Sequence, residues 1–190
     1  MKRILINDRC LYRPNAGVAM YLRNVLSHWP ADAAVQPAGF MSDHLGRRPQ
    51  SAGPPQGATP LQLRPLAKLG RPATLGTRLP HWARRGLQKL YASAYAGAAR
   101  RGYAGQFEPN HLAVPADVPT AATIHDLSVL DHGEWHPDDR VQWWRADLER
   151  AVAATDRWIA VSQFTRRRMI DALSLPPERI EVIPLAAREL

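Results

Sequence analysis

The chain holds a single cysteine, Cys10, among its 190 residues. One cysteine excludes an internal disulfide framework and any zinc cluster built from cysteine ligands. Apolar runs are short, and none approaches the roughly 20 residues that a membrane-spanning helix requires. The apolar part of residues 1–7 is also too short for a signal peptide. From these absences we expect a cytoplasmic protein in a reducing compartment.

Histidines are few and scattered, which argues against a metal centre. They stand at positions 28, 44, 81, 111, 125, 132 and 136. His132 and His136 have the spacing of one helical turn, but Pro137 puts His136 at a helix boundary. A dinucleotide fingerprint of three glycines is missing around Gly17. We therefore predict no metal and no bound cofactor.

Acidic residues are missing from a long central segment. Residues 44–107 contain no Asp or Glu, yet they carry eleven of the chain's 25 Lys and Arg residues. This segment alone makes the chain basic, with a net charge of +8. Prolines recur over 49–80 and disfavour long helices there. We expect an excursion from the folded core at about 43–79.

Short apolar strands alternate with amphipathic helices over the rest of the chain. The patterns predict strands at 3–7, 34–40, 119–124, 157–161 and 180–183, and helices at 18–29, 80–101, 137–155 and 163–173. Buried strands rich in β-branched residues that alternate with helices are typical of a parallel sheet. The sequence therefore predicts an α/β fold with one domain, residues 1–190, built on a single Rossmann-like doubly wound parallel sheet.

Five segments occur in an order and spacing that resemble a known family. They are Phe-Glu-Pro-Asn at 107–110, Thr-Ile-His-Asp-Leu-Ser at 123–128, Glu-Trp-His-Pro at 134–137, Val-Ser-Gln-Phe-Thr at 161–165 and the run 176–185. The series resembles the N-terminal half of the family-four retaining glycosyltransferases, most nearly the mannosyltransferase-like members. Residues 17–24 are similar to that family's first glycine-rich turn.

The resemblance implies the GT-B architecture, in which two Rossmann-like domains face each other across a cleft. The first domain holds mainly the acceptor and the second mainly the nucleotide-sugar. The chain is thereby expected to be the acceptor-side domain, without the C-terminal donor-binding domain. The family's retaining transfer is often described as a front-face attack, in which the donor's own phosphate takes the acceptor proton. A dedicated protein base is then not required.

Two candidate catalytic residues, His125 and Asp126, follow the predicted strand 119–124. Ligands of open α/β sheets bind where strands end. A histidine donates to a sugar hydroxyl and a carboxylate accepts from one, and the resemblance implies that His125 lies close to the reacting sugar. The residues equally allow a hydrogen-bonded loop pair, with Asp126 bonding nearby backbone N–H groups.

The candidate substrate-binding residues are Gly17, Tyr21, Asn110, Trp135 and Ser162. Three of these residues also have a structural explanation: Gly17 as a turn glycine, Trp135 as a packing residue and Ser162 as a helix N-cap. Two positions depart from the family pattern. Ala19 stands where many members carry a second glycine, with a methyl group expected to keep a phosphate away from the backbone, and Gln163 stands where glutamate is frequent.

A basic helix is predicted at 80–101, and its candidate membrane-surface residues are Trp82, Arg84, Arg85 and Lys89. An amphipathic helix of this kind docks on anionic lipid. The same charges also suit nucleic acid or a solvated surface. No nucleic-acid-binding module is recognisable, so we expect no nucleic-acid partner. If the basic helix docks on lipid, we expect the protein to be peripheral at the inner membrane face.

These observations predict the acceptor-binding half of a retaining glycosyltransferase that is inactive alone. It would transfer a hexose, with mannose from GDP-mannose as the first choice, to a lipid-linked or polysaccharide acceptor. The nucleotide-sugar would bind only with a donor domain, supplied by a longer enzyme or by a separate chain. Self-association of an exposed apolar face is a further expectation. The alternative is a non-catalytic module that binds carbohydrate or a protein partner.

Overall fold

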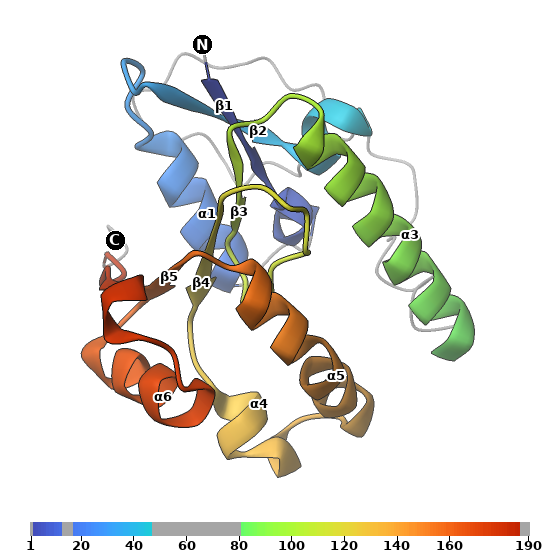
Figure 1. The fold of residues 1–190 in the computed structure, drawn as a ribbon, viewed down its shortest axis with the longest axis vertical. Coiled ribbons are helices and arrows are strands. Elements are labelled where there is room, and N and C mark those ends of the chain that lie inside the picture. The colour runs from blue at the N-terminus through green and yellow to red at the C-terminus, as the bar shows by residue number, and fades with distance from the viewer. Residues whose placement is uncertain (1, 13–16, 47–80, 187–190) are drawn as a thin grey trace.

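A computed structural model describes residues 2–12, 17–46 and 81–186. In this part of the chain six strands form one parallel sheet with the order β2-β1-β3-β4-β5-β6, flanked by helices (Figure 1). The predicted α/β fold with a single Rossmann-like parallel sheet is confirmed. Residues 47–79 of the predicted excursion lie outside the described residues.

The five predicted strands and the four predicted helices are present, and the structure adds one further strand, β3, between α3 and β4, as well as the short helix α4. The strands are β1 (Lys2–Ile6), β2 (Val35–Gly39), β3 (Gly105–Glu108), β4 (Thr120–Ile124), β5 (Arg157–Ala160) and β6 (Ile180–Val182). The α-helices are α1 (Gly17–Ser27), α3 (His81–Arg100), α4 (Ser128–Asp131), α5 (Asp138–Ala154) and α6 (Gln163–Leu173). Short 3-10 turns are η1 (Asp8–Tyr12), η4 (Gly133–Trp135) and η5 (Pro177–Arg179), and η2 (Phe40–His44) is a π-helical turn.

Alternating side chains of the strands pack against helices on opposite faces of the sheet. On one face Ile6 packs with Leu22 of α1. On the other face Leu5 packs with Tyr95 of α3, and further along the sheet Trp158 of β5 packs with Trp144 of α5. The chain thus covers one face with α1 and the other with α3, α5 and α6, as right-handed crossovers require.

The strand order fixes where a ligand crevice lies. The chain runs from β1 to β2 on one side of β1 and then returns to β3 on its other side. This reversal is a topological switch point, and open α/β sheets bind ligands there, beyond the carboxyl ends of the strands. The relevant residues are therefore those that directly follow β1, β3 and their neighbour β4.

Candidate functional site

His125 directly follows β4 at the carboxyl edge of the sheet. Its Nε2 lies 2.9 Å from the carbonyl oxygen of Pro109, which follows β3. A carbonyl oxygen only accepts hydrogen bonds, so Nε2 carries a hydrogen. The neutral ring then has its lone pair on Nδ1, for which the described residues supply no hydrogen-bond partner. This tautomer accepts a hydrogen bond from a sugar hydroxyl at Nδ1 and donates one there only when the ring is protonated.

Tyr21 of α1 packs against His125. The two ring centroids are 5.0 Å apart in an edge-to-face arrangement, and the Tyr21 hydroxyl lies 3.0 Å from Oγ1 of Thr123. Burial raises the pKa of the Tyr21 hydroxyl, against a smaller opposing effect of the bond to Thr123. Tyr21 therefore stays neutral where it packs against the His125 ring.

Asp126 is occupied by the loop that follows it. One of its oxygens, Oδ1, accepts hydrogen bonds from the backbone N–H of Ser128 at 2.9 Å and from the Ser128 hydroxyl at 2.6 Å. Burial alone would raise the pKa of Asp126, but the bonds from Ser128 and the nearby histidines lower it. Because the Ser128 hydroxyl donates to Asp126, it accepts from Nε2 of His136 at 2.9 Å. Asp126 thus takes the loop-pair arrangement, next to the start of α4.

A buried acidic residue, Glu108, ends β3 at the same edge of the sheet. Its carboxylate accepts from Nδ2 of Asn7 at 2.5 Å and from the backbone N–H of Asn110 at 3.0 Å. Burial raises the pKa of Glu108 to about 7, although the charge of Arg9 and these two bonds lower it. The Tyr91 hydroxyl of α3 donates to Oδ1 of Asn7 at 2.6 Å.

The sequence reasoning missed Asn7 and Glu108 as site residues. Glu108 was part of the segment 107–110, but no strand was predicted before it, so nothing placed its side chain at the end of a strand. The usable signal was the strand order, which places an acidic residue at the end of β3 beside an amide that directly follows β1, next to the switch point.

The ring of His111 contacts the rings of His125 and Trp144. Its ring centroid is 6.1 Å from that of His125 and 6.1 Å from that of Trp144. Burial lowers the pKa of His111 to about 4, and Nδ1 is buried without a hydrogen-bond partner in the described part of the chain. His111 is therefore a neutral, packed residue over the ordinary pH range.

The predicted substrate-binding residues are spread over the edge of the sheet. Gly17 begins α1, and a Cβ built on it would meet no atom within 4 Å. The backbone of Asn110 binds Glu108. The Ser162 hydroxyl accepts from the backbone N–H of Thr165 at 3.0 Å and so caps α6. Gly17, Asn110 and Ser162 therefore begin helices or turns at the carboxyl edge, beside the strand ends.

Trp135 and Ala19 occupy environments that bear on their predicted roles. Trp135 is 67% exposed and stacks on His132 with ring centroids 3.8 Å apart. Ala19 is fully buried and packs in the cluster around Ile6. The expectation that the Ala19 methyl group limits the approach of a phosphate is therefore wrong, because this methyl group lies in the core.

The first half of α3 presents exposed apolar and basic side chains. Leu87 is 55% exposed and Leu90 is 67% exposed, and Arg85 and Lys89 are exposed on the same helix. Figure 1 shows this half of α3 extending away from the sheet. The side chains of Trp82 and Arg84 lie outside the described part of the structure.

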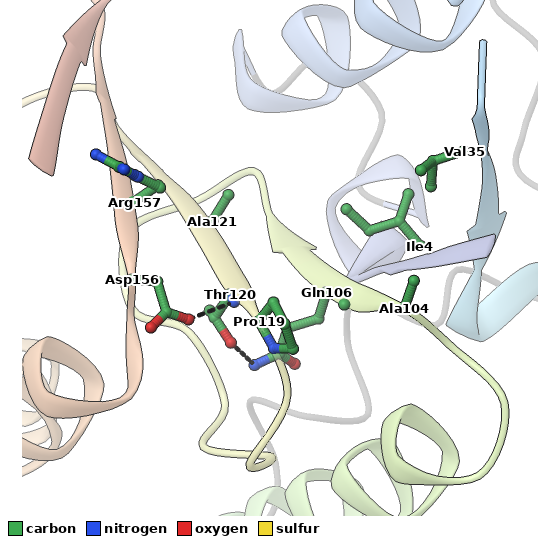
Figure 2. Close-up of a pocket in the computed structure, with 10 residues that line it drawn as sticks. Ile4, Val35, Ala104, Gln106, Pro119, Thr120, Ala121, Asp156 and Arg157 are labelled. Carbon is green, nitrogen blue, oxygen red and sulfur yellow. Dashed lines mark hydrogen bonds between the residues drawn. The ribbon is translucent and has the colours of Figure 1, made fainter. Parts of the chain in front are cut away.

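A hollow of about 230 Å³ lies at the opposite edge of the sheet, where the strands begin. Figure 2 shows its lining, which includes Ile4, Thr120, Asp156 and Arg157. Asp156 accepts the backbone N–H of Thr120 at 2.8 Å, so its carboxylate is used in holding β4. This hollow is separate from the strand ends that carry His125 and Glu108.

The described residues offer no metal cluster and no membrane-spanning helix. No group of three or more His, Cys, Asp and Glu side chains that could hold a metal ion occurs in residues 2–12, 17–46 and 81–186. Within the same ranges, every helix is too short or too polar to cross a bilayer.

Comparison with known proteins identifies the family of this chain. The family model described as Glycosyltransferase Family 4 matches residues 16–187. The chain is also similar to the O-antigen chain mannosyltransferase B of Escherichia coli, with 33% identity over 64 residues, which are 34% of this chain and 17% of that protein. The alignment thus spans less than a fifth of the relative's length. Since the family model covers most of the chain, and the sheet carries a polar carboxyl edge at its switch point, the chain belongs to glycosyltransferase family 4.

Proposed function

We propose that this chain is the acceptor-binding half of a retaining GT-B glycosyltransferase. It transfers a hexose, mannose from GDP-mannose in the first instance, to a lipid-linked or polysaccharide acceptor. The observation that carries the proposal is the anchored imidazole of His125 beside the switch point. The choice of mannose rests on the resemblance in the sequence and on the name of the Escherichia coli relative.

The chemistry assigned to His125 is the positioning of a sugar hydroxyl. With Nε2–H donated to Pro109, the neutral ring accepts a hydroxyl hydrogen at Nδ1. In the front-face mechanism implied by the resemblance, the acceptor oxygen forms the new glycosidic bond while the sugar leaves the donor phosphate, which takes the acceptor proton. His125 therefore orients the sugar and removes no proton, and orientation contributes much of the rate of such transfers.

Asp126 contributes a second acceptor to the same edge. Its Oδ1 is used by Ser128, and its lowered pKa keeps the carboxylate ionised near neutral pH. Its second oxygen is available to accept a sugar hydroxyl. The Ser128 bonds fix the direction of that oxygen, so the loop arrangement and a role in binding are compatible.

The donor side is proposed to come from a second Rossmann-like domain, and the 190-residue chain alone is expected to show negligible transfer. The test combines this chain with a donor domain from a related enzyme and measures transfer from GDP-mannose and from UDP-glucose. His125→Ala should lower transfer by about 100-fold, the cost of misplacing a bound reactant. His28→Ala serves as the control, because His28 is exposed directly after the end of α1 and, within the described part of the chain, contacts none of the candidate site residues.

The alternative function is a non-catalytic module that binds carbohydrate or a protein partner. Saturable glycan binding by the chain, without transfer in any combination with a donor domain, would favour this alternative. Equal transfer by His125→Ala and the unchanged chain would remove the proposed role of His125 while leaving glycosyl transfer in place.

We also propose that the first half of α3 contacts an anionic membrane. Leu87 and Leu90 supply exposed apolar area, and Arg85 and Lys89 supply charge beside it, which together favour an interfacial helix. Flotation with vesicles of phosphatidylcholine and phosphatidylglycerol should show binding that falls when Leu87 and Leu90 are both changed to Ser. Binding that is indifferent to anionic lipid and to this double change would contradict the proposal.

A further inference from the structure

Glu108 occupies a costly position at the switch point of the sheet. It is the last residue of β3 and is 5% exposed, and Asn7, which directly follows the neighbouring strand β1, is 4% exposed. Burying a carboxylate is unfavourable unless hydrogen bonds compensate it. An apolar residue of similar size would fill this space at a lower cost in free energy. The buried carboxylate therefore calls for an explanation other than packing.

The hydrogen bonds of Glu108 connect three parts of the fold. One oxygen accepts from the side chain of Asn7 and so links β3 to the residue after β1. The other oxygen accepts from the backbone N–H of Asn110, two residues further along the chain. Asn7 in turn accepts from the hydroxyl of Tyr91 on α3. Both carboxylate oxygens are therefore used, and their partners fix the turn that begins at Pro109.

That turn holds His125. The Pro109 carbonyl lies 2.9 Å from Nε2 of His125, and the backbone N–H of His111 donates to the carbonyl of Thr123 at 2.8 Å. His111 has a φ of 68°, a conformation that residues other than glycine adopt infrequently. The turn after β3 is thus fastened to the end of β4, and the direction of the Pro109 carbonyl sets the direction of the imidazole.

We propose that Glu108 is a positioning residue for His125, acting through the Asn110 backbone and the Pro109 carbonyl. The proposal rests on the proposed function for the role of the imidazole in transfer, but the coupling of Glu108 to the ring is a property of this chain alone. Glu108 itself touches no substrate in this account. Its effect is to keep His125 as the Nε2–H tautomer with Nδ1 directed to the ligand.

Two substitutions separate positioning from simple support of the fold. Glu108→Gln keeps the size of the side chain but replaces one acceptor oxygen by an NH₂ group. That group would face the N–H of Asn110 or of Asn7, both of which are donors, so one hydrogen bond is lost. Tyr91→Phe leaves Glu108 in place and removes only the hydroxyl that orients Asn7. Glu149→Gln is the matched control, because Glu149 is exposed on α5.

The readout is the pair of ring ¹⁵N signals of His125 in the 190-residue chain, assigned with His125→Ala and recorded with amide spectra that report folding. We expect one dominant Nε2–H tautomer in the unchanged chain and in Glu149→Gln. Glu108→Gln should give a mixture of tautomers, and Tyr91→Phe a smaller change in the same direction. With a donor domain added, Glu108→Gln should lower kcat by about tenfold or more, since misplacement of a catalytic contact by about 1 Å costs up to 100-fold.

The outcomes discriminate between the two proposals. Unchanged His125 signals in folded Glu108→Gln would overturn the positioning role, whether or not transfer is observed. Changed signals together with no transfer by any combination would sustain the positioning role and reject the proposed function. If Glu108→Gln does not fold, the signals of Tyr91→Phe decide, and a spectrum identical to that of the unchanged chain overturns the inference.

Discussion

The stability of the protein should depend on pH through the burial of Glu108. The folded-state pKa of Glu108 is about 7, against an ordinary value of 4.5, and burial of the carboxyl group is the main reason that it is raised. Between these two values the unfolded chain has released the proton and the folded chain still holds it. A pKa raised by folding contributes stability that is fully present below the unfolded pKa and is lost as the pH rises through the folded pKa. Stability from this group therefore falls between about pH 4.5 and pH 7.

The size of the effect follows from the two pKa values. One proton corresponds to about 1.4 kcal/mol for each pH unit, so Glu108 should lower the free energy of unfolding by about 3 kcal/mol between pH 5 and pH 8. His111 works in the opposite direction, because its pKa is lowered to about 4. The contributions of the two residues to the pH dependence of stability partly cancel between about pH 4.5 and pH 6.5. Unfolding of the unchanged protein alone would therefore reveal neither contribution.

The assay that separates them is urea unfolding of the unchanged chain and of Glu108→Gln at pH 5, 6, 7 and 8. Glutamine does not titrate, so the difference between the two free energies isolates Glu108. As the pH rises from 5 to 8, the unchanged chain should lose about 3 kcal/mol of stability relative to Glu108→Gln. Glu149→Gln, at an exposed position, should show no such trend. A Glu108 difference that stays constant within about 0.5 kcal/mol, the usual scale of surface substitutions, would refute the reasoning.

Four further changes test the packing, charge and capping of the fold. Gly39→Ala should lower the free energy of unfolding by about 2 kcal/mol, because the added Cβ would clash with the Ser42 hydroxyl and the Asp8 carboxylate. Gly17→Ala, with open space around it, should be neutral or stabilising by up to about 1 kcal/mol in urea unfolding. His111→Asn should remove a loss of up to about 3 kcal/mol that the unchanged chain suffers as the pH falls from about 6.5 toward 4, which urea unfolding at pH 4.5 and 7 measures. Ser162→Ala should cost about 1 kcal/mol through the lost cap of α6, and an unchanged thermal midpoint would contradict this.

The regular part of the fold could be predicted from the sequence because its signals are local. Hydrophobic periodicity placed the strand before His125 at 119–124, and the structure has β4 at Thr120–Ile124. The stop at Pro176 and the cap at Ser162 likewise bound α6 within the predicted range. Apolar residues that recur with the period of a helix or a strand identify elements before any tertiary contact is known.

The strand β3 escaped prediction because it has no apolar pattern. It contains Gly105, Gln106, Phe107 and Glu108, of which two are polar and still buried. Gln106 donates to the Val114 carbonyl at 2.7 Å, and Glu108 binds Asn7, so tertiary hydrogen bonds allow these side chains to be buried. Asn7 lies far along the chain from Glu108, and neither hydrogen-bond partner can be read from a local hydrophobic pattern.

The same distinction holds for the candidate site. His125 and Asp126 could be predicted because they directly follow a recognisable strand. The tautomer of His125 could not, since it depends on the Pro109 carbonyl of another loop. The switch-point cluster of Asn7 and Glu108 also required the strand order, which places the end of β1 beside the end of β3.

The central claim is that the carboxyl edge around His125 positions an acceptor sugar for transfer. Its most direct test is transfer from GDP-mannose by this chain combined with a donor domain from a related enzyme, measured beside each component alone and beside the combination with His125→Ala. We expect transfer by the combination only, reduced by about 100-fold with His125→Ala. Glycan binding without transfer in any combination, or transfer that His125→Ala leaves unchanged, would contradict it.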